Sequence, residues 1–416
     1  MAVVRPATLL SAVALAMTGS LLSPFTARAQ TVPSTTPALT IGVLEDMTGV
    51  YSDITGKAQV VAARMAVDDF GGTVLGRPIR IIAADHGNKA DTGASVVRNW
   101  FDNDGVAMIA GLGNSAVALA AQTVAAQKHK IDIVTSAGSS DLSGASCVPT
   151  GFHWAFDTYS TSKVVSSSIT QGGGNTWYYV AADYTFGTLL ENTSTRFVEE
   201  FGGKVLGASK VPLGTQDFSS YLLAAQSSGA KVIGLANGGS DTTNAIKQAA
   251  EFGLTRQGRE LAALSIYVQE VRGLGATAAG LFMAESFYWD TDDATRAWSK
   301  RIFAETHEMP NMLQAGIYSG VLHYLKAVRQ AGTDDGPTVA RVMHEMPVND
   351  FYSHDVQVRA DGQVMRPMYL LQVKQPAEQH GDWDLLKIVK TVPGQEAFMP
   401  ASESRCPLLK EKAATQ

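Results

Sequence analysis

The sequence predicts an α/β protein built from two doubly wound lobes. Strand-like and helix-like segments alternate along most of the chain, and this alternation is typical of parallel sheets with helices on both faces. The pattern pauses over residues 152–160 and then starts again, which indicates a second sheet. The 416 residues also exceed the length that a single hydrophobic core usually supports.

In the first lobe we expect four strands with helices between them. Each strand is a short apolar run, and each helix has apolar residues at the spacing of one helical face. A further Ala-rich helix opens at residue 115. The strands are expected at residues 39–46, 79–85, 106–110 and 130–138, and the first two helices at residues 57–70 and 92–104.

In the second lobe the same unit repeats. Two of its helices are expected in "SSYLLAAQSSG" and "TTNAIKQAAEFG". A late helix at residues 312–332 is followed by a strand at 368–374, and these later elements are candidates to complete the first lobe. The strands of the second lobe are expected at residues 175–183, 202–211, 230–237 and 280–289.

Residues 1–29 have the layout of a secretory signal peptide. One early positive charge, Arg5, precedes an apolar stretch, and Ala27-Arg28-Ala29 has the form of a cleavage site. Removing these 29 of 416 residues would leave 387, still enough for two domains. No second apolar run approaches the roughly 18 to 20 residues needed to cross a bilayer. We therefore expect an exported, soluble protein cleaved near Ala29.

Composition narrows the classes of function. A net charge of −6 without a basic stripe argues against binding to nucleic acid or to anionic membrane surfaces. The two cysteines, Cys147 and Cys406, are 259 positions apart. In an exported protein they predict one disulfide that ties the C-terminal tail to the first lobe, because a zinc site needs clustered ligands.

Motifs of enzyme active sites are missing. No G-x-S-x-G sequence occurs, and the eight histidines are scattered without metal-ligand spacing. His307-Glu308 and His344-Glu345 resemble the start of H-E-x-x-H, but a proline stands in the fourth place and no second histidine follows. The sequence therefore predicts no catalytic residues, no metal and no cofactor.

One motif invites a cofactor interpretation. Gly111-Leu112-Gly113-Asn114-Ser115-Ala116 joins a strand to a helix with the pattern G-x-G-x-x-A, which is known from dinucleotide-binding sites. That fingerprint also requires an acidic residue at the end of the next strand, and Asp132 begins its strand instead. The free N–H groups of such a turn suit a carboxylate as well as a phosphate.

A second turn of the same kind, "TSAGSSD" (residues 135–141), follows the next strand. Because the carboxyl ends of parallel strands share one edge of a sheet, both turns should reach the same crevice. Their serine hydroxyls are then candidate ligand donors. The alternative is that these serines only cap helices.

Aromatic residues point to a partly apolar ligand. Tyr51 lies in the loop after the first strand, Tyr184 and Phe186 lie in the matching loop of the second lobe, and Tyr288 closes a predicted strand. Loops at strand ends are usually polar, so aromatic side chains there favour a binding site over a purely structural role.

With these motifs in order, the chain resembles the periplasmic solute-binding proteins of branched-chain amino acid-type ABC transporters. The likeness rests on "IGVLEDMTGVYSDITG", "GLGNSAVALA", "TSAGSSDLSG", "DYTFG", "LANGGSDTTNAIKQAAEFGL" and "ESFYWD". It implies two Rossmann-like lobes joined by a three-crossing hinge. The implied first lobe is residues 38–155 plus 287–355, the second is 156–286 plus 356–391, and a tail covers 392–416.

The resemblance also implies the function and the site. The expected function is capture of a small carboxylate, either an apolar amino acid or an aromatic acid, for an inner-membrane ABC permease. The expected protein is a periplasmic monomer, and a sensory subunit that signals without transport is the alternative. The implied ligand-binding residues are Tyr51, Asn114, Ser115, Ala137, Gly138, Ser139, Phe186, Asn237, Gly238, Tyr267 and Tyr288.

One departure from the family concerns the ligand's amine. Amino-acid binders of this family hold the α-ammonium with a second-lobe acid, and no acid falls at the expected place here. The corresponding stretch, "LSIYVQEVRGLG", offers Tyr267 and Gln269, with Glu270 available only if the alignment shifts. An α-amino group on the ligand is therefore optional.

Overall fold

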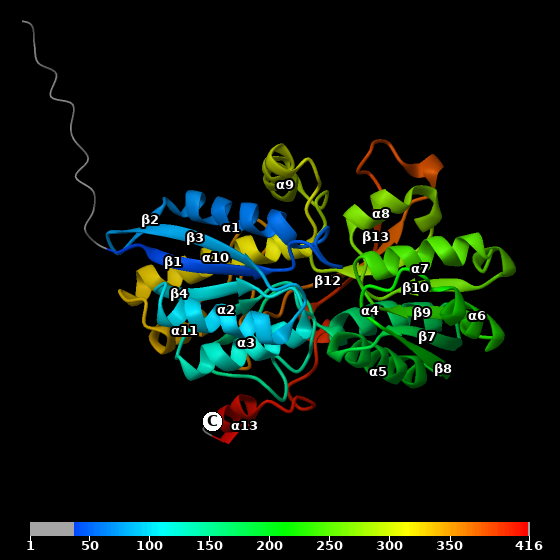
Figure 1. Cartoon of the computed structure of the whole chain (residues 1–416), viewed down its shortest axis with the longest axis horizontal. Helices are drawn as coiled ribbons and strands as arrows, with labels where there is room; N and C mark the ends of the chain where they lie inside the picture. The colour runs from blue at the N-terminus through cyan, green and yellow to red at the C-terminus, as the bar shows by residue number, and fades with distance from the viewer. Residues whose placement is uncertain (1–36, 415–416) are drawn as a thin grey trace, which may run out of the picture. The chain divides into compact units, whose positions relative to one another are not determined.

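The computed structural model describes residues 37–414. The predicted signal peptide at residues 1–29 lies outside this range. Within it the chain forms a six-stranded sheet and a seven-stranded sheet, each covered by helices (Figure 1). The predicted two-lobed α/β class is thereby confirmed.

The first sheet has the strand order β2-β3-β1-β4-β5-β6. All its pairs are parallel except β2–β3. The sheet consists of β1 (Leu39–Glu45), β2 (Thr73–Val74), β3 (Arg77–Asp85), β4 (Val106–Gly111), β5 (Ile131–Val134) and β6 (Gly151–His153). Its helices are α1 (Gly56–Phe70), α2 (Ala90–Asp102), α3 (Ser115–Gln127), α9 (Asp293–Thr306), α10 (Met312–Ala331) and α11 (Gly336–Glu345).

The second sheet has the strand order β13-β12-β11-β10-β9-β7-β8, in which β12 pairs antiparallel with both neighbours. Its strands are β7 (Thr176–Ala182), β8 (Lys204–Val211), β9 (Val232–Ala236), β10 (Glu260–Ala263), β11 (Phe282–Glu285), β12 (Met368–Val373) and β13 (Leu386–Val392). The surrounding helices are α4 (Thr158–Gln171), α5 (Thr185–Glu200), α6 (Ser219–Ser227), α7 (Ser240–Glu251), α8 (Val268–Leu274) and α12 (Gly394–Ala397), with short 3₁₀ turns at Thr255–Gln257, Gly275–Ala278 and Pro376–Glu378.

The chain passes between the two sheets three times. It leaves the first sheet after β6, returns after β11 to add α9 to α11, and leaves again after α11 to add β12 and β13. The late helix α10 packs against α1, and most of its residues are buried. The later helices therefore belong to the first lobe, whereas the late strand at 368–374, a candidate for the same lobe, pairs as β12 in the second sheet.

Each sheet reverses its strand order beside its first strand. In the first sheet β1 lies between β3 and β4, and in the second sheet β7 lies between β8 and β9. The loops that follow such neighbouring strands diverge to opposite faces and leave a crevice at their carboxyl ends. The loops after β1, β4 and β7 are the ones that carry Tyr51, Ser115 and Phe186.

The C-terminal tail adds a further connection between the lobes. Beyond β13, α12 packs against α4 of the second lobe, and Arg196 of α5 forms an ion pair with Glu403. Cys406 then forms a disulfide with Cys147, which follows β5 of the first lobe. This is the pairing that the cysteine count predicted. The chain ends near this point in the short helix α13 (Pro407–Ala414).

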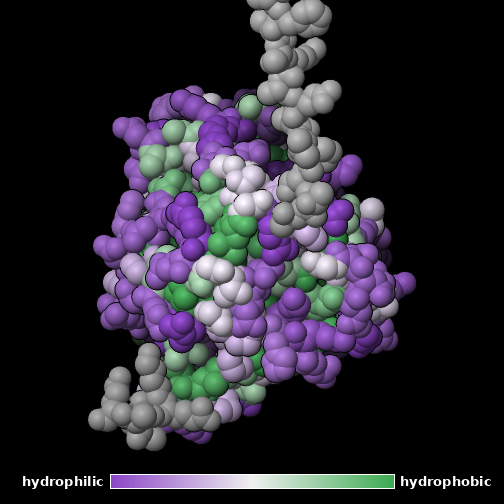
Figure 2. All heavy atoms as spheres, turned by 90° about the vertical axis from the view of Figure 1, so that its left-hand side faces the viewer, coloured by the Kyte–Doolittle hydropathy of each residue, from purple (hydrophilic) through white to green (hydrophobic). Residues whose placement is uncertain are grey.

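The molecular face in Figure 2 is mainly hydrophilic, with small hydrophobic areas between the polar ones. Large exposed apolar side chains such as Leu75, Leu223 and Phe252 are far apart in the sequence and lie on different elements. Scattered apolar residues of this kind are normal on a folded surface. No helix in residues 37–414 combines the length and the hydropathy of a membrane span.

Candidate functional site

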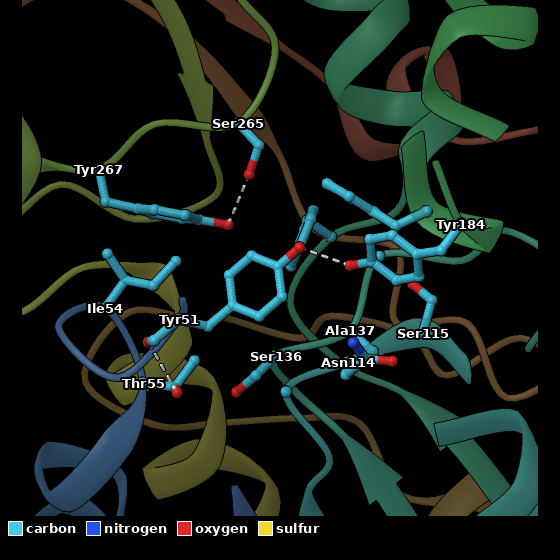
Figure 3. Close-up of a pocket in the computed structure, with 14 residues that line it drawn as sticks. Tyr51, Ile54, Thr55, Asn114, Ser115, Ser136, Ala137, Tyr184, Ser265 and Tyr267 are labelled. Atoms are coloured by element: carbon cyan, nitrogen blue, oxygen red, sulfur yellow. Dashed lines mark hydrogen bonds between the residues drawn. The ribbon is translucent and has the colours of Figure 1, made fainter. Parts of the chain in front are cut away.

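A small cavity lies where loops from both lobes meet (Figure 3). Its volume is about 20 Å³, which is room for about one water molecule. A larger ligand can therefore enter only if the two lobes part. The residues that line it are Tyr51, Ile54, Thr55, Gly113, Asn114, Ser115, Ser136, Ala137, Gly138, Phe156, Tyr184, Phe186, Ser265 and Tyr267.

Seven of the eleven residues implied by the resemblance line this cavity. From the first lobe they are Tyr51, the Asn114-Ser115 pair and the Ala137-Gly138 pair, and from the second lobe they are Phe186 and Tyr267. The loops that carry them lie far apart in the sequence and come together because they all follow strand ends.

Three implied residues lie next to the cavity without lining it. Ser139 is buried, and its hydroxyl accepts a hydrogen bond from the N–H of Asp141 (3.3 Å). The Asn237 side-chain oxygen accepts from the Thr242 hydroxyl (2.7 Å). Gly238 lies under the ring of Tyr51, where an added Cβ would be 3.4 Å from ring atom Cε1.

The expectation that Tyr288 faces the ligand does not fit the structure. The strand that Tyr288 was expected to close ends at Glu285, so the residue lies on the crossing toward α9. Its hydroxyl donates to the carbonyl of Leu386 (3.1 Å), and its ring packs in a separate hydrophobic core of the second lobe. Tyr288 therefore lies outside the cavity because the strand is shorter than its apolar run suggests.

Seven lining residues were not among those implied. Thr55, Ser136 and Tyr184 follow the same strand ends as implied neighbours, so their position in the loops was a signal for them. Ser265 follows β10, a strand too short and Ala-rich to be recognised from periodicity. The remaining ones are Ile54, Gly113 and Phe156.

Asn114 and Ser115 have separate roles at the start of α3. Asn114 is the helix cap, since its side-chain oxygen accepts from the N–H groups of Ala116 (2.9 Å) and Val117 (3.2 Å). The Ser115 hydroxyl is buried and has no hydrogen-bond partner within residues 37–414. The capping alternative therefore applies to Asn114 and leaves Ser115 available to a ligand.

Backbone donors surround the Ser115 hydroxyl. In the part of the chain that the structure describes, the N–H groups of Ser115, Ala137 and Gly138 have no acceptor. Ser115 is the first residue of the 13-residue helix α3, whose dipole attracts negative charge, while Ala137 and Gly138 belong to the loop after β5. No Lys or Arg is present among the 14 lining residues. This end of the cavity is suited to an anion that is held by neutral donors.

Aromatic rings form the apolar walls. Gly138 lies between two of them, because an added Cβ would be 2.8 Å from the rings of both Phe156 and Phe186. Tyr184 lies beside Phe186, with ring centroids 6.2 Å apart. A glycine is needed at this position for the first-lobe turn to fit against the rings of Phe156 and Phe186.

The lobes contact each other directly at the cavity. The Tyr51 and Tyr184 hydroxyls, one from each lobe, form a 2.5 Å hydrogen bond. The N–H of Ser240 at the start of α7 donates to the carbonyl of Val50 (3.0 Å). These contacts define a closed arrangement of the two lobes.

None of the 14 described residues that line the cavity is acidic, and the suspected Glu270 is not among them. One Glu270 oxygen accepts from the N–H of Tyr267 (3.0 Å) and caps α8. Burial raises the pKa of Glu270 well above its ordinary value. Glu270 is therefore a capping residue behind Tyr267 that does not line the cavity.

Glu45 lies behind the first-lobe turns. Its carboxyl accepts from the Ser136 hydroxyl (2.7 Å), which itself accepts from the Gln59 amide (3.1 Å). Glycine at 113 makes room for it, because an added Cβ there would be 2.3 Å from a Glu45 oxygen. Burial raises the pKa of Glu45 to about 8, although the hydrogen bond from Ser136 opposes this shift. Glu45 is thus neutral at pH 7 and adds little negative charge near the anion-binding end.

The raised pKa predicts that the protein loses stability as pH rises. The folded chain keeps a proton on Glu45 that the unfolded chain releases near pH 4.5, so the free energy of unfolding should fall between pH 4.5 and about 8. Glu45→Gln should flatten this decline in thermal unfolding measured from pH 5 to 8. Part of the decline should remain, since burial also raises the pKa of Glu285 to about 8. An unchanged pH profile in the variant would contradict the prediction.

The described residues also lack the clusters of side chains that bind metal ions. Within residues 37–414, no group of three or more His, Cys, Asp or Glu side chains is arranged to hold a metal ion. The cavity combines an anion-binding end with aromatic walls, which is an arrangement for reversible binding of a small molecule.

Comparison with known proteins agrees with this interpretation. A family model described as periplasmic binding protein matches residues 38–380. The crystal structure of a periplasmic binding protein from Burkholderia mallei is 45% identical, with a TM-score of 0.87, and the match covers 89% of this chain and 99% of that one. A branched-chain amino acid ABC transporter periplasmic ligand-binding protein from Burkholderia xenovorans LB400 is 37% identical, with a TM-score of 0.79, covering 89% of this chain and 100% of that one.

A curated relative is more distant. The Leu/Ile/Val-binding protein homolog 6 of Brucella melitensis is 28% identical over 218 residues, which are 48% of this chain and 55% of that protein. The chain thus matches about half the length of this relative. The matched family consists of solute-binding proteins rather than enzymes, and its model covers most of this chain. The chain belongs to the periplasmic binding protein family.

Proposed function

We propose that this protein is the periplasmic substrate-binding component of an ABC importer, and that it captures a small carboxylate with an apolar or aromatic body. Residues 1–29 would direct export, and the mature protein would act as a monomer that delivers its ligand to an inner-membrane permease. The observation that carries the proposal is the partnerless Ser115 hydroxyl, which lies among free N–H groups opposite aromatic walls.

The carboxylate would bind at the first-lobe turns. Ser115, Ala137 and Gly138 offer one hydroxyl and three N–H donors, and oriented backbone donors stabilise an anion without a formal positive charge. Tyr51, Phe156 and Phe186 would enclose the apolar body. The ligand would enter between parted lobes and then draw them together by contacts to both, around a space wider than the present cavity, which has a volume of about 20 Å³.

An importer role is supported by the relatives. The 37% identical Burkholderia xenovorans protein is described as part of a branched-chain amino acid ABC transporter. The alternative, a sensory subunit without transport, has the same fold. Neighbouring genes for a permease and an ATPase would favour transport, whereas a neighbouring regulator would favour sensing.

Ser115→Ala is expected to weaken ligand binding by about one to two orders of magnitude. A hydrogen bond to a charged group contributes roughly 1.5–3 kcal/mol, and the hydroxyl has no other partner whose loss would unfold the protein. Calorimetric titration with the acid that binds the wild type most tightly would measure the effect. Ser139→Ala is the matched control, since that serine does not line the cavity. Equal affinity in wild type and Ser115→Ala would contradict the carboxylate site.

A matched ligand pair tests the role of the amine. Because no acidic side chain lines the cavity, 3-phenylpropanoate is expected to bind at least as tightly as phenylalanine. Calorimetry with both compounds measures the contribution of the α-ammonium group alone. Binding of phenylalanine without binding of 3-phenylpropanoate would require an acid that reaches the ligand.

A further inference from the structure

A cluster of four hydroxyls lines the same cavity as the anion-binding end. It consists of Tyr51, Tyr184, Ser265 and Tyr267, which come from three different loops and two lobes. Figure 3 shows these hydroxyls as two hydrogen-bonded pairs, Ser265 with Tyr267 and Tyr51 with Tyr184, and draws Asn114 and Ser115 on the side of Tyr184, away from Tyr267. Tyr51, Ser265 and Tyr267 are all buried, so water does not freely solvate their hydroxyls.

In the hydroxyl cluster, some O–H protons are not donated to any acceptor. Tyr51 and Tyr184 share one hydrogen bond of 2.5 Å, so only one of their two protons is donated in it. Ser265 donates to the Tyr267 oxygen at 3.5 Å, which leaves the Tyr267 proton without an acceptor. Within the described residues, two buried O–H groups therefore lack a partner in the closed arrangement.

The charges near the cluster restrict what can supply the missing acceptor. Asp46 and Asp241 lie close enough to raise the pKa of Tyr51, after the larger effect of burial. Burial raises the pKa of Tyr267 well above its ordinary value, although the hydrogen bond with Ser265 opposes this shift. The tyrosines are thus held as neutral donors. A second carboxylate on the ligand would be repelled by Asp46 and Asp241 near this cluster, and none of the lining residues is a Lys or Arg that could balance it.

An ammonium group is equally unsuited to this cluster. It has only donors, and it would face two O–H groups that themselves require an acceptor. An aliphatic group would leave both protons unpartnered in a buried site, which is a costly arrangement. A neutral oxygen avoids both problems, since it accepts from the tyrosines and carries no net charge.

We propose that the hydroxyl cluster recognises a neutral oxygen acceptor, such as a phenolic hydroxyl, at the end of the ligand opposite its carboxylate. This inference rests on the proposed function, because it extends the same carboxylate site to a second polar contact. It names the ligand class as hydroxylated aromatic acids rather than unsubstituted aromatic acids or amino acids.

Calorimetry with paired probes tests the inference. Benzoate, phenylacetate and 3-phenylpropanoate would each be titrated with and without a para hydroxyl, so that one chain length matches the spacing of the two ends. In the best-fitting pair, the hydroxyl is expected to increase affinity about tenfold. Tyr267→Phe should reduce this ratio to about one, and Ser265→Ala should lower it as well. Tyr288→Phe is the matched control, since its hydroxyl lies outside the cavity.

The outcomes distinguish a failure of the hydroxyl cluster from a failure of the proposed carboxylate site. If the parent acids bind and the hydroxyl gives no gain in any pair, or if Tyr267→Phe keeps the gain, the hydroxyl cluster does not select the ligand and the inference is overturned. If none of the six acids binds the wild type, the proposed aromatic carboxylate ligand fails and the inference fails with it.

Discussion

Gly239→Ala is expected to weaken ligand binding by about ten- to a hundredfold while both lobes remain folded. Gly239 precedes α7 with φ 64° and ψ −144°, a conformation that is essentially restricted to glycine. A Cβ at this position would lie 2.2 Å from the carbonyl oxygen of Val50, which belongs to the other lobe. The clash exists only when the lobes are closed, so the substitution should act against closure more than against folding.

The loss of ligand affinity in Gly239→Ala can be measured directly. Calorimetry gives the affinity, and small-angle scattering with saturating ligand reports whether the radius of gyration still decreases. Gly229→Ala is the matched control, because Gly229 is also in the second lobe and also has a positive φ (73°), while an added Cβ there meets no atom within 4 Å. Wild-type affinity in Gly239→Ala would mean that the bound state does not use the contact between Val50 and α7.

Removal of the disulfide should produce the second large effect. The bond between Cys147 and Cys406 closes a sequence separation of 259 residues, and a long closed loop restricts the unfolded chain strongly. Replacing both cysteines by serine should lower the free energy of unfolding by about 4 kcal/mol, near the upper end of measured effects. The tail should also lose its only covalent link to the first lobe in the described part of the chain.

Thermal unfolding with and without a reductant provides the measurement. The midpoint of the wild type should fall by several degrees when the reductant is added, whereas the double variant should start low and stay unchanged. If the wild type keeps its midpoint under reduction, the tail detaches without affecting the lobes. In that case the ion pair of Glu403 with Arg196 and the other tail contacts add little to global stability.

Much of the architecture was predictable from local patterns. Alternating apolar runs and amphipathic helices predicted two lobes, because hydrophobic periodicity depends on neighbouring residues in the chain. The turn that contains Ser115 was predictable for the same reason, since a glycine-rich strand end before an Ala-rich helix is a local signal. The cysteine pair could be predicted because there were only two candidates.

Other features depended on the tertiary structure. The segment "ELAA" is too short for its pattern of apolar residues to distinguish a strand from a helix. The strand β10 and the position of Ser265 after it were therefore not predicted. Tyr288 and Glu270 look like site residues in the sequence. In the structure, the crossing after β11 directs the Tyr288 side chain into the hydrophobic core of the second lobe. The Glu270 carboxyl caps α8 behind Tyr267.

The binding site itself was decided by the way the two lobes meet. Tyr51 and Tyr184, which form a hydrogen bond at the site, are 133 residues apart. A side chain at position 239 is excluded because Val50 of the other lobe approaches it closely. Local sequence determines which loops follow strand ends. Strand order and the three crossings determine which of those loops face each other, because those contacts join residues that are distant in the chain.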